Sequence, residues 1–489
     1  ITNFKFNKMS DNHTVEKYIE SYPFLQYIND NHGQYKHARE AGYKDPNDLF
    51  MIGESGGFLL DIRKGDKFVN TNLLTEMASL YHINGEKYTL YKEDSIPHRQ
   101  LRKREEYRRK HGFDAPCFMR NGEVRNLHIS GDMYNYLNYT IIEQLDEKTI
   151  IHTDKGSVAK KKQDFPKFID AQFWTFAIIE FCELNGFHLL IDKTRRGGFS
   201  YIMASHSANK INLQPNKVCI HVAADSKYLT KRGGLTDFTI RNLYFYENKT
   251  FFKRGILSRA AENFTLGFKL PNGDISPNSW NSALFSASAN NNPDCAIGKD
   301  AVSVKTEEVS TMENFDEYMN VTEPAMRTGS YVTGNLFAWG TATSGNMQTF
   351  ERNFYNPSAF HFIAFENVWD KDSRNEVCGY FKPYCWGLQG QIGDRYAMDA
   401  DGNSDIEMGL RIAYKERTDK KVHSKTFSDY INYLGQYANM PSESFSSTSE
   451  NLFSSEALMN WEEVLKNDPA YTNISDDGMF FEDADGKVI

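Results

Sequence analysis

The sequence predicts an α/β fold with a mainly parallel central sheet flanked by helices. Three observations predict it. Between residues 165 and 345, short apolar runs alternate with helix-like segments, which is typical of parallel sheets. These runs are rich in β-branched residues and end in polar turns. With 489 residues, 40% of them hydrophobic, the chain is long enough for about three domains with buried cores.

Four apolar runs in this region are the expected strands. They are FHLLI (187–191), KVCIHVAA (217–224), AVSVKTEE (301–308) and NLFAWGTAT (335–343). Ligands of open parallel sheets bind at the carboxyl ends of the strands. The candidate site residues therefore lie in 193–200, 307–308 and 340–343.

The regions around this core differ in texture. We expect an N-terminal extension over 1–153, the α/β core over 154–345, a smaller second subdomain over 346–470 and an acidic linker over 471–489. The extension holds a helix-like stretch at 96–111. Its aromatic run at 127–142 is expected to pack in a core, and we assign no chemistry to it.

The net charge of -9 argues against a surface that is basic throughout, but basic residues gather in three short segments. In LRKREEYRRK (101–110), Glu105 and Glu106 can pair with neighbouring basic side chains, which indicates a solvated helix face. For 155–162 and 226–232, contact with nucleic acid stays open.

The sequence indicates neither a membrane span nor secretion, since no run approaches 18 apolar residues and the first residues have no leader pattern. Its first residue, Ile1, predicts that the chain is processed or a fragment. Six scattered cysteines include no C-x-x-C pair and are expected to be reduced and buried, as in a cytosolic protein.

The segment HLLIDKTRRGGFSYIMASHS (188–207) resembles a phosphate-binding loop between a strand and a helix. In the pattern G-x-x-x-x-G-K-[ST], backbone N–H groups and a lysine hold the phosphates, and the hydroxyl binds Mg²⁺. Gly198 and Ser200 fit this pattern, but Phe199 stands at the lysine position and Lys193 at the first glycine. Taken alone, the segment could also be an ordinary strand–turn–helix with solvated arginines.

Two adjacent carboxylates end the third predicted strand. Phosphoryl transfer needs one carboxylate near the metal and another to orient water, which gives Glu307 the metal role and Glu308 the water role. Aspartate is more usual at the first position. A Glu-Glu pair by itself is also compatible with a surface turn.

Two further segments complete the set. GTATSG (340–345) places Gly340, Thr341 and Thr343 where small hydroxylated residues could sense a γ-phosphate and relay its loss. Upstream, Gln172 enters an apolar helix, and its amide can both donate to and accept from an adenine edge. The alternative for Gln172 is an exposed position on an amphipathic helix.

In this order, the Gln172 segment, KTRRGGFS, VSVKTEEVS and GTATSG resemble the ATPase part of the large terminase subunit of tailed bacteriophages. The likeness is strongest over 127–453. The resemblance implies a P-loop NTPase that binds ATP and Mg²⁺, with a loop variant whose basic residue lies earlier. It makes Lys193 and Arg196 the best phosphate ligands, catalytic together with Glu308. The implied nucleotide-binding set is Gln172, Lys193, Thr194, Arg195, Arg196, Gly197, Gly198, Phe199 and Ser200, with Ser200 and Glu307 at the metal.

The same resemblance implies a DNA-packaging motor. It would hydrolyse ATP in the presence of Mg²⁺ and DNA, translocate double-stranded DNA into a procapsid, and work in the host cytoplasm, docked as a ring on the portal. A small terminase subunit is a further expected partner. In a ring, Arg232 or Arg241 could serve the neighbouring subunit. Net acidity fits a motor that must release DNA in every cycle.

Large terminases also carry a C-terminal nuclease, which we expect to be absent from this chain. The acidic runs 398–405 and 481–489 have no strands around them and are interpreted as turns. Two alternatives stay open. One is another nucleic-acid ATPase such as a helicase, although no second strand–helix series follows Gly345. The other is a catalytically inactive adaptor, which Phe199 favours.

Overall fold

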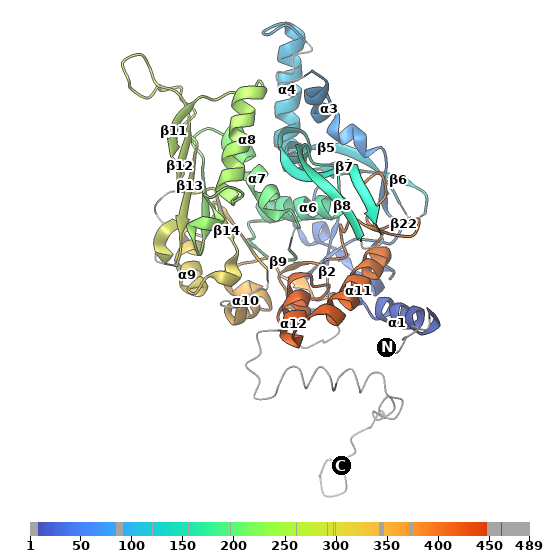
Figure 1. Ribbon diagram of the computed structural model, residues 1–489. Helices are drawn as coiled ribbons and strands as arrows, with labels where there is room; N and C mark the ends of the chain where they lie inside the picture. The colour runs from blue at the N-terminus through green and yellow to red at the C-terminus, as the bar shows by residue number, and fades with distance from the viewer. Residues whose placement is uncertain are drawn as a thin grey trace, which may run out of the picture.

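The computed structural model describes residues 8–84, 91–119, 121–153, 156–195, 197–260, 262–290, 292–296, 298, 300–341, 347–370, 376–446 and 461. The largest sheet of this part has eight strands (Figure 1). In spatial order they are β11 (Ile256–Ala260), β12 (Asn263–Leu266), β13 (Ala283–Ser288), β10 (Val218–Ala223), β14 (Ser303–Glu307), β17 (Asn335–Gly340), β9 (Leu189–Lys193) and β20 (Tyr380–Lys382).

The predicted mainly parallel sheet is confirmed. From β13 to β20 every pair of neighbours is parallel, and only β12 and β11 run antiparallel within this described sheet. The four predicted strands are β9, β10, β14 and β17. β9 runs two residues further than expected, since Asp192 and Lys193 are buried and pair with β20. β11, β12, β13 and β20 were not predicted.

Helices cover both faces of the sheet, as expected. Adjacent residues of a strand point to opposite faces. On β14, Glu307 contacts Ser200 of α7 and Thr306 contacts Tyr318 of α9, so these two helices lie on opposite faces. The helices of the described part are α1 (Lys8–Glu20), α2 (Pro23–Tyr27), α3 (Glu76–Asn84), α4 (Ile96–His111), α5 (Gly131–Tyr139), α6 (Asp170–Asn185), α7 (Phe199–Leu213), α8 (Leu235–Lys249), α9 (Phe315–Ala325), α10 (Met347–Phe354), α11 (Ile406–His423), α12 (Phe427–Gln436) and α13 (Pro441–Ser444).

The expected segments are interleaved in space. β20 comes from beyond residue 345, yet it pairs with β9 at the edge of the main sheet. A second sheet joins β3 of the N-terminal region to β18. Its order is β1 (Lys36–His37), β2 (Phe50–Ile52), β3 (Phe58–Leu60), β18 (Phe365–Glu366) and β19 (Val377–Cys378). The expected boundary at 345 is therefore not an edge of the main sheet, and 471–489 lies outside the described residues.

The remaining strands form small sheets and hairpins. They are β4 (Lys67–Phe68), β5 (Phe113–Phe118) and β6 (Val124–Ile129); β7 (Ile142–Thr153) with β8 (Gly156–Asp164); β15 (Arg327–Thr328) with β16 (Tyr331–Val332); and β21 (Gln391–Ile392) with β22 (Arg395–Tyr396). α1 packs against α11 (Figure 1). One hydrophobic cluster runs from Ile19 to Phe445 and includes β9, β14 and β17, which unites these parts around one core.

The basic segments form regular structure with local partners. The helix predicted over 96–111 is α4, but its expected solvated face is only partly so, because Glu105 and Arg109 are buried against the core. Segment 155–162 contributes to β8, where Lys161 pairs with Glu143 at 3.1 Å. Segment 226–232 begins as a 3₁₀ turn, where Lys227 pairs with Asp225 at 3.4 Å.

Three smaller expectations also have outcomes. The acidic run 398–405 contains a tight turn, as interpreted: Asp399 accepts hydrogen bonds from the backbone of Asp401 and Asn403. The run 481–489 lies outside the described residues. All six cysteines are buried and free. Among the described helices, none has the length and apolar character needed to cross a bilayer.

Candidate functional site

The loop after β9 leads directly into α7. Gly198 is the residue before the helix and has a φ of +76°, a left-handed conformation that favours glycine. Phe199 begins the helix and is 2% exposed in the main hydrophobic cluster. A lysine at this position would bury its charge among apolar groups. The side chain at the lysine position of the motif is therefore a packing residue.

Lys193, at the end of β9, occupies the centre of the site. Its Nζ lies 2.9 Å from Oε1 of Glu308, which follows β14, and 3.0 Å from Oγ1 of Thr341, which follows β17. The strand order explains this, because β17 lies between β9 and β14 and all three are parallel. Their carboxyl ends thus bring one cation, one carboxylate and one hydroxyl together.

Ser200 and Glu307 form the second part of the site. The Ser200 hydroxyl, in the first turn of α7, donates a hydrogen bond to Oε1 of Glu307. Burial raises the pKa of Glu307 to about 7; Ser200 opposes the shift, and the Glu308 carboxylate adds to it. Oε2 of Glu307 is buried and makes no hydrogen bond within the described residues. A hydroxyl and a carboxylate with a free oxygen fit the oxygen ligands that Mg²⁺ takes.

Glu308 has an unusual backbone. Its φ is +53°, in the left-handed region that a residue with a β-carbon rarely adopts. The following 3₁₀ turn, η6 (Val309–Thr311), holds it there, since the Glu308 carbonyl accepts hydrogen bonds from both the backbone and the hydroxyl of Thr311. Glu307 and Glu308 therefore point in different directions, one toward α7 and one toward Lys193.

The end of β17 is packed closely against η6. A β-carbon on Gly340 would lie 3.1 Å from the backbone nitrogen of Ser310, so this approach favours glycine. The Ser310 hydroxyl donates to the carbonyl of Thr341 at 2.8 Å. Gly340 and Thr341 thus contact both Lys193 and the turn that carries Glu308. Thr343, the third expected coupling residue, lies outside the described residues.

Gln172 lies next to the loop, in the first turn of α6. Its Nε2 would be 3.7 Å from a β-carbon on Gly198 and lies 3.4 Å from the Tyr136 hydroxyl, while its Oε1 is buried without a hydrogen-bond partner among the described residues. Gln172 lines a cavity of about 180 Å³. The other lining residues include Tyr136, Ile142, Gln144, Lys162, Ile169 and Gln389. The β7–β8 hairpin forms part of the wall.

The outer part of the loop is less defined. Thr194 is buried, and the side chain of Arg195 is exposed. The backbone N–H of Arg195 donates to the carbonyl of Gln436 at 3.0 Å, a contact with no sequence signal because it involves only main-chain atoms. Arg196, expected to be a phosphate ligand, lies outside the described residues.

Sequence reasoning missed Asp192, the residue before Lys193. It is fully buried on β9, and burial raises its pKa to about 8 against the opposing effect of the nearby Ser444 hydroxyl. The available signal was a carboxylate inside the otherwise apolar run LLIDK. Asp192 is therefore a neutral acid directly behind the site lysine at neutral pH.

The two arginines expected to serve a neighbouring subunit lie on the α8 side of the molecule. Arg232 is exposed just before α8, and Arg241 pairs with Asp237 at 2.6 Å one turn earlier on the same helix. Neither is among the residues that the structure brings together around Lys193.

One further cluster carries charged ligand types. Asp132, Glu183 and His206 lie close together under α7. Lys210 donates to Glu183 at 2.7 Å, and Glu183 accepts from His206 at 2.9 Å. This cluster is charge-compensated by the protein itself.

Comparisons with known proteins gave matches among solved structures alone. No family model matches the chain, and no curated protein matches it. The chain is similar to the large terminase ATPase domain of Thermus phage P74-26, with 12% identity, a TM-score of 0.30, and coverage of 51% of this chain and 87% of that chain. It is also similar to the large terminase from a thermophilic bacteriophage in complex with ADP (10%, 0.31, 52% and 48%) and to the HK97 bacteriophage large terminase (9%, 0.34, 57% and 51%). These matches span about half of the two full terminase chains.

Proposed function

We propose that this chain is an ATP hydrolase that drives double-stranded DNA into a viral procapsid. The observation that carries the proposal is the convergence of Lys193, Ser200, Glu307, Glu308 and Thr341 at the carboxyl ends of three adjacent parallel strands. Binding at that edge is expected for an open α/β sheet, and these residue types are the ones that phosphoryl transfer requires.

Each residue has a role that follows from its position. Lys193 is the cation that neutralises phosphate charge, with backbone N–H groups of the loop and the start of α7 as further donors. Ser200 and Glu307 would hold Mg²⁺, which when bound neutralises phosphate oxygens. Glu308 orients the attacking water and accepts its proton. Its observed contact with Lys193 places this carboxylate at the phosphate side of the site.

The base would lie in the cavity beside Gln172. An adenine edge offers an amino donor next to an acceptor nitrogen, and the buried Oε1 of Gln172 needs a donor of this kind. The cavity, of about 180 Å³, is of the order expected for a single base. We therefore propose ATP as the nucleotide. Gln172→Ala should reduce the preference for ATP over GTP, and equal preference in parent and variant would contradict this assignment.

The motor function is proposed from the order of the motifs along the chain and their resemblance to large terminases. Gly340 and Thr341 join Lys193 to the turn that carries Glu308, so a change at the phosphates would reach the turn. The proposed partners are duplex DNA, a portal-bearing procapsid, further copies in a ring and a small terminase subunit. The proposed place of action is the host cytoplasm at the portal.

The two alternatives differ in measurable ways. Purified protein should hydrolyse ATP faster when linear duplex DNA and portal-bearing procapsids are added together, and the DNA should become protected from added nuclease. A helicase would instead separate the strands of a tailed duplex without procapsids. An adaptor would show no turnover in any mixture. The chain alone should leave supercoiled plasmid uncut in Mg²⁺ or Mn²⁺, since we propose no nuclease role for it.

A further inference from the structure

The phosphate loop is held from outside by a short segment of the C-terminal region. We call residues 436–443, from the last residue of α12 into α13, the support turn. The backbone N–H of Arg195 donates to the Gln436 carbonyl at 3.0 Å. The same turn is bonded to the end of the main sheet, since the backbone N–H of Tyr384, just after β20, donates to the Ala438 carbonyl at 2.8 Å. The support turn therefore lies between the loop and the edge strand beside β9.

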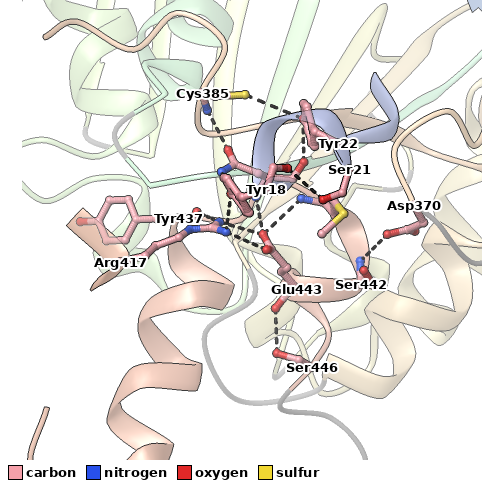
Figure 2. A network of polar contacts seen from close by, with 12 residues as sticks. Tyr18, Ser21, Tyr22, Asp370, Cys385, Arg417, Tyr437, Ser442, Glu443 and Ser446 are labelled. Carbon is pink, nitrogen blue, oxygen red and sulfur yellow. Dashed lines mark hydrogen bonds and ion pairs between the residues drawn. The ribbon is translucent and has the colours of Figure 1, made fainter. Parts of the chain in front are cut away.

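The shape of the support turn depends on a buried ion pair. Arg417 on α11 donates to both carboxylate oxygens of Glu443, at 2.7 and 2.8 Å, and to the Tyr437 carbonyl at 2.9 Å (Figure 2). Glu443 in turn accepts from the backbone N–H groups of Asn439, at 2.6 Å, and Met440, at 3.3 Å. The pair thus fixes the turn at both ends, beginning with the residue after Gln436.

The same network includes the N-terminal helix. The Tyr18 hydroxyl accepts from Arg417 at 2.9 Å and from the Asn439 side chain at 3.1 Å. Two residues after α1, the Tyr22 hydroxyl donates to the Asn439 carbonyl at 2.7 Å. Figure 2 shows these side chains converging on Arg417 and Glu443. The support turn is therefore bonded to α1, α11 and the loop at once.

Arg417 is buried, and a buried guanidinium needs a partner in matched geometry. Its planar fork serves a carboxylate and a carbonyl together, which a lysine ammonium cannot do in the same way. The loop contains Gly197 and Gly198, so its own backbone resists deformation weakly. An external contact such as that of Gln436 is then what restrains its conformation.

We propose that the Arg417–Glu443 pair is a positioning device for the phosphate loop, which makes nucleotide affinity depend on how α1 and α11 are seated. This inference rests on the proposed role of the loop in binding phosphate. Arg417 acts through the support turn and is a positioning residue. Lys193, Glu307 and Glu308 are held by other elements, so the device should change nucleotide binding more than the chemical step.

The test is Arg417→Lys, with Arg411→Lys as the matched control. Arg411 lies on the same helix and also bonds to α1, through Glu16 at 2.7 Å, but the structure gives it no contact with the support turn among the described residues. Hydrogen exchange of the loop amides is measured on the nucleotide-free protein, and KM for ATP and kcat are measured separately. Tyr18→Phe, which removes one hydroxyl from the network, is a milder second variant should Arg417→Lys fold poorly.

Arg417→Lys is expected to speed exchange at Arg195 and to raise KM by about fivefold or more, with kcat changed less than KM, whereas Arg411→Lys stays near the parent. Tyr18→Phe should change exchange and KM in the same direction, by less. Equal effects of Arg417→Lys and Arg411→Lys, or no effect of Arg417→Lys and Tyr18→Phe, would overturn the proposal. If the parent itself does not bind ATP, the proposed function fails, while the exchange measurement still decides whether Arg417 restrains the loop.

Discussion

Lys193 and Phe199 divide the tasks that a single lysine performs in the usual phosphate-loop pattern. Phe199 fills space under the first turn of α7, and Lys193 reaches the site from the end of β9. A lysine on the strand is fixed by the sheet, and its ammonium is set by Glu308 and Thr341. The sequence pattern could state that the loop departs from the motif, but not which residue replaces the missing charge.

Lys193→Ala should therefore lower ATP turnover by about a hundredfold, since it removes a charge-assisted contact to the phosphates. Arg196→Ala is expected to have a similar effect if that residue also binds phosphate. Phe199→Lys should not improve turnover and should destabilise the protein, because it buries an ammonium in the core. Steady-state kinetics and chemical denaturation of the variants check this. Undiminished turnover in both Lys193→Ala and Arg196→Ala would favour the adaptor alternative.

Asp192 predicts a pH dependence of stability. Its pKa is raised from 3.8 in the unfolded chain to about 8 by burial, so the folded protein keeps a proton that the unfolded chain releases. Stability from this group is present below pH 3.8 and is lost as the pH rises toward 8. Asp192→Asn removes this loss. The free energy of unfolding of the variant, relative to the parent, should rise between these values by up to about 1.4 kcal/mol per pH unit.

Urea denaturation of parent and Asp192→Asn at several pH values measures this difference. Glu307, whose pKa is raised to about 7, has a similar effect on both proteins and cancels in the comparison. A difference that stays constant with pH would show that Asp192 is ionised in the folded protein.

At the scale of elements, α4 illustrates what a charge pattern cannot reveal. Its sequence is strongly basic, yet Arg109 is buried between the rings of Tyr139, Tyr246 and Phe252, at 4.9, 4.6 and 4.4 Å. Arg109 also donates to Asn209 of α7 at 3.1 Å. One face of α4 is thus a polar and aromatic interface with the core, and the helix period alone does not separate this face from the solvated one.

Arg109→Lys is expected to destabilise the protein by about 2 kcal/mol, because an ammonium cannot stack between the rings and serve the asparagines at the same time. Arg108→Lys, one residue earlier and partly exposed, should cost less than about 1 kcal/mol. Denaturant midpoints of the two variants give the comparison. Equal losses would mean that the buried position of Arg109 has no special energetic role.

The strands show the same limit. β9, β10, β14 and β17 were predictable because each is an apolar run in the core region. β20 was not, since it is three residues long and lies in a segment whose sequence is typical of loops. Its place beside β9 depends on tertiary packing, and with it comes the connection from the site to the C-terminal region.

At the scale of the whole molecule, the extension, the core and the C-terminal segment are joined by shared sheets and by the network around Arg417. The site was largely predictable, since Lys193, Ser200, Glu307, Glu308 and Thr341 all follow predicted strands. The joining of distant segments was not, because it depends on pairings between strands hundreds of residues apart. A motor built this way would transmit a change at the phosphates through bonded contacts rather than through a hinge between separate domains.

The most direct test of the central claim is ATP turnover by the parent and by Glu308→Gln, with duplex DNA present. Glutamine keeps the shape of Glu308 but cannot accept a proton from water, so ATP binding should persist while turnover falls by about a hundredfold or more. Glu313→Gln, an exposed glutamate shortly after β14, is the control and should match the parent. Turnover of Glu308→Gln within about twofold of the parent would contradict the assignment of this site as the centre of ATP hydrolysis.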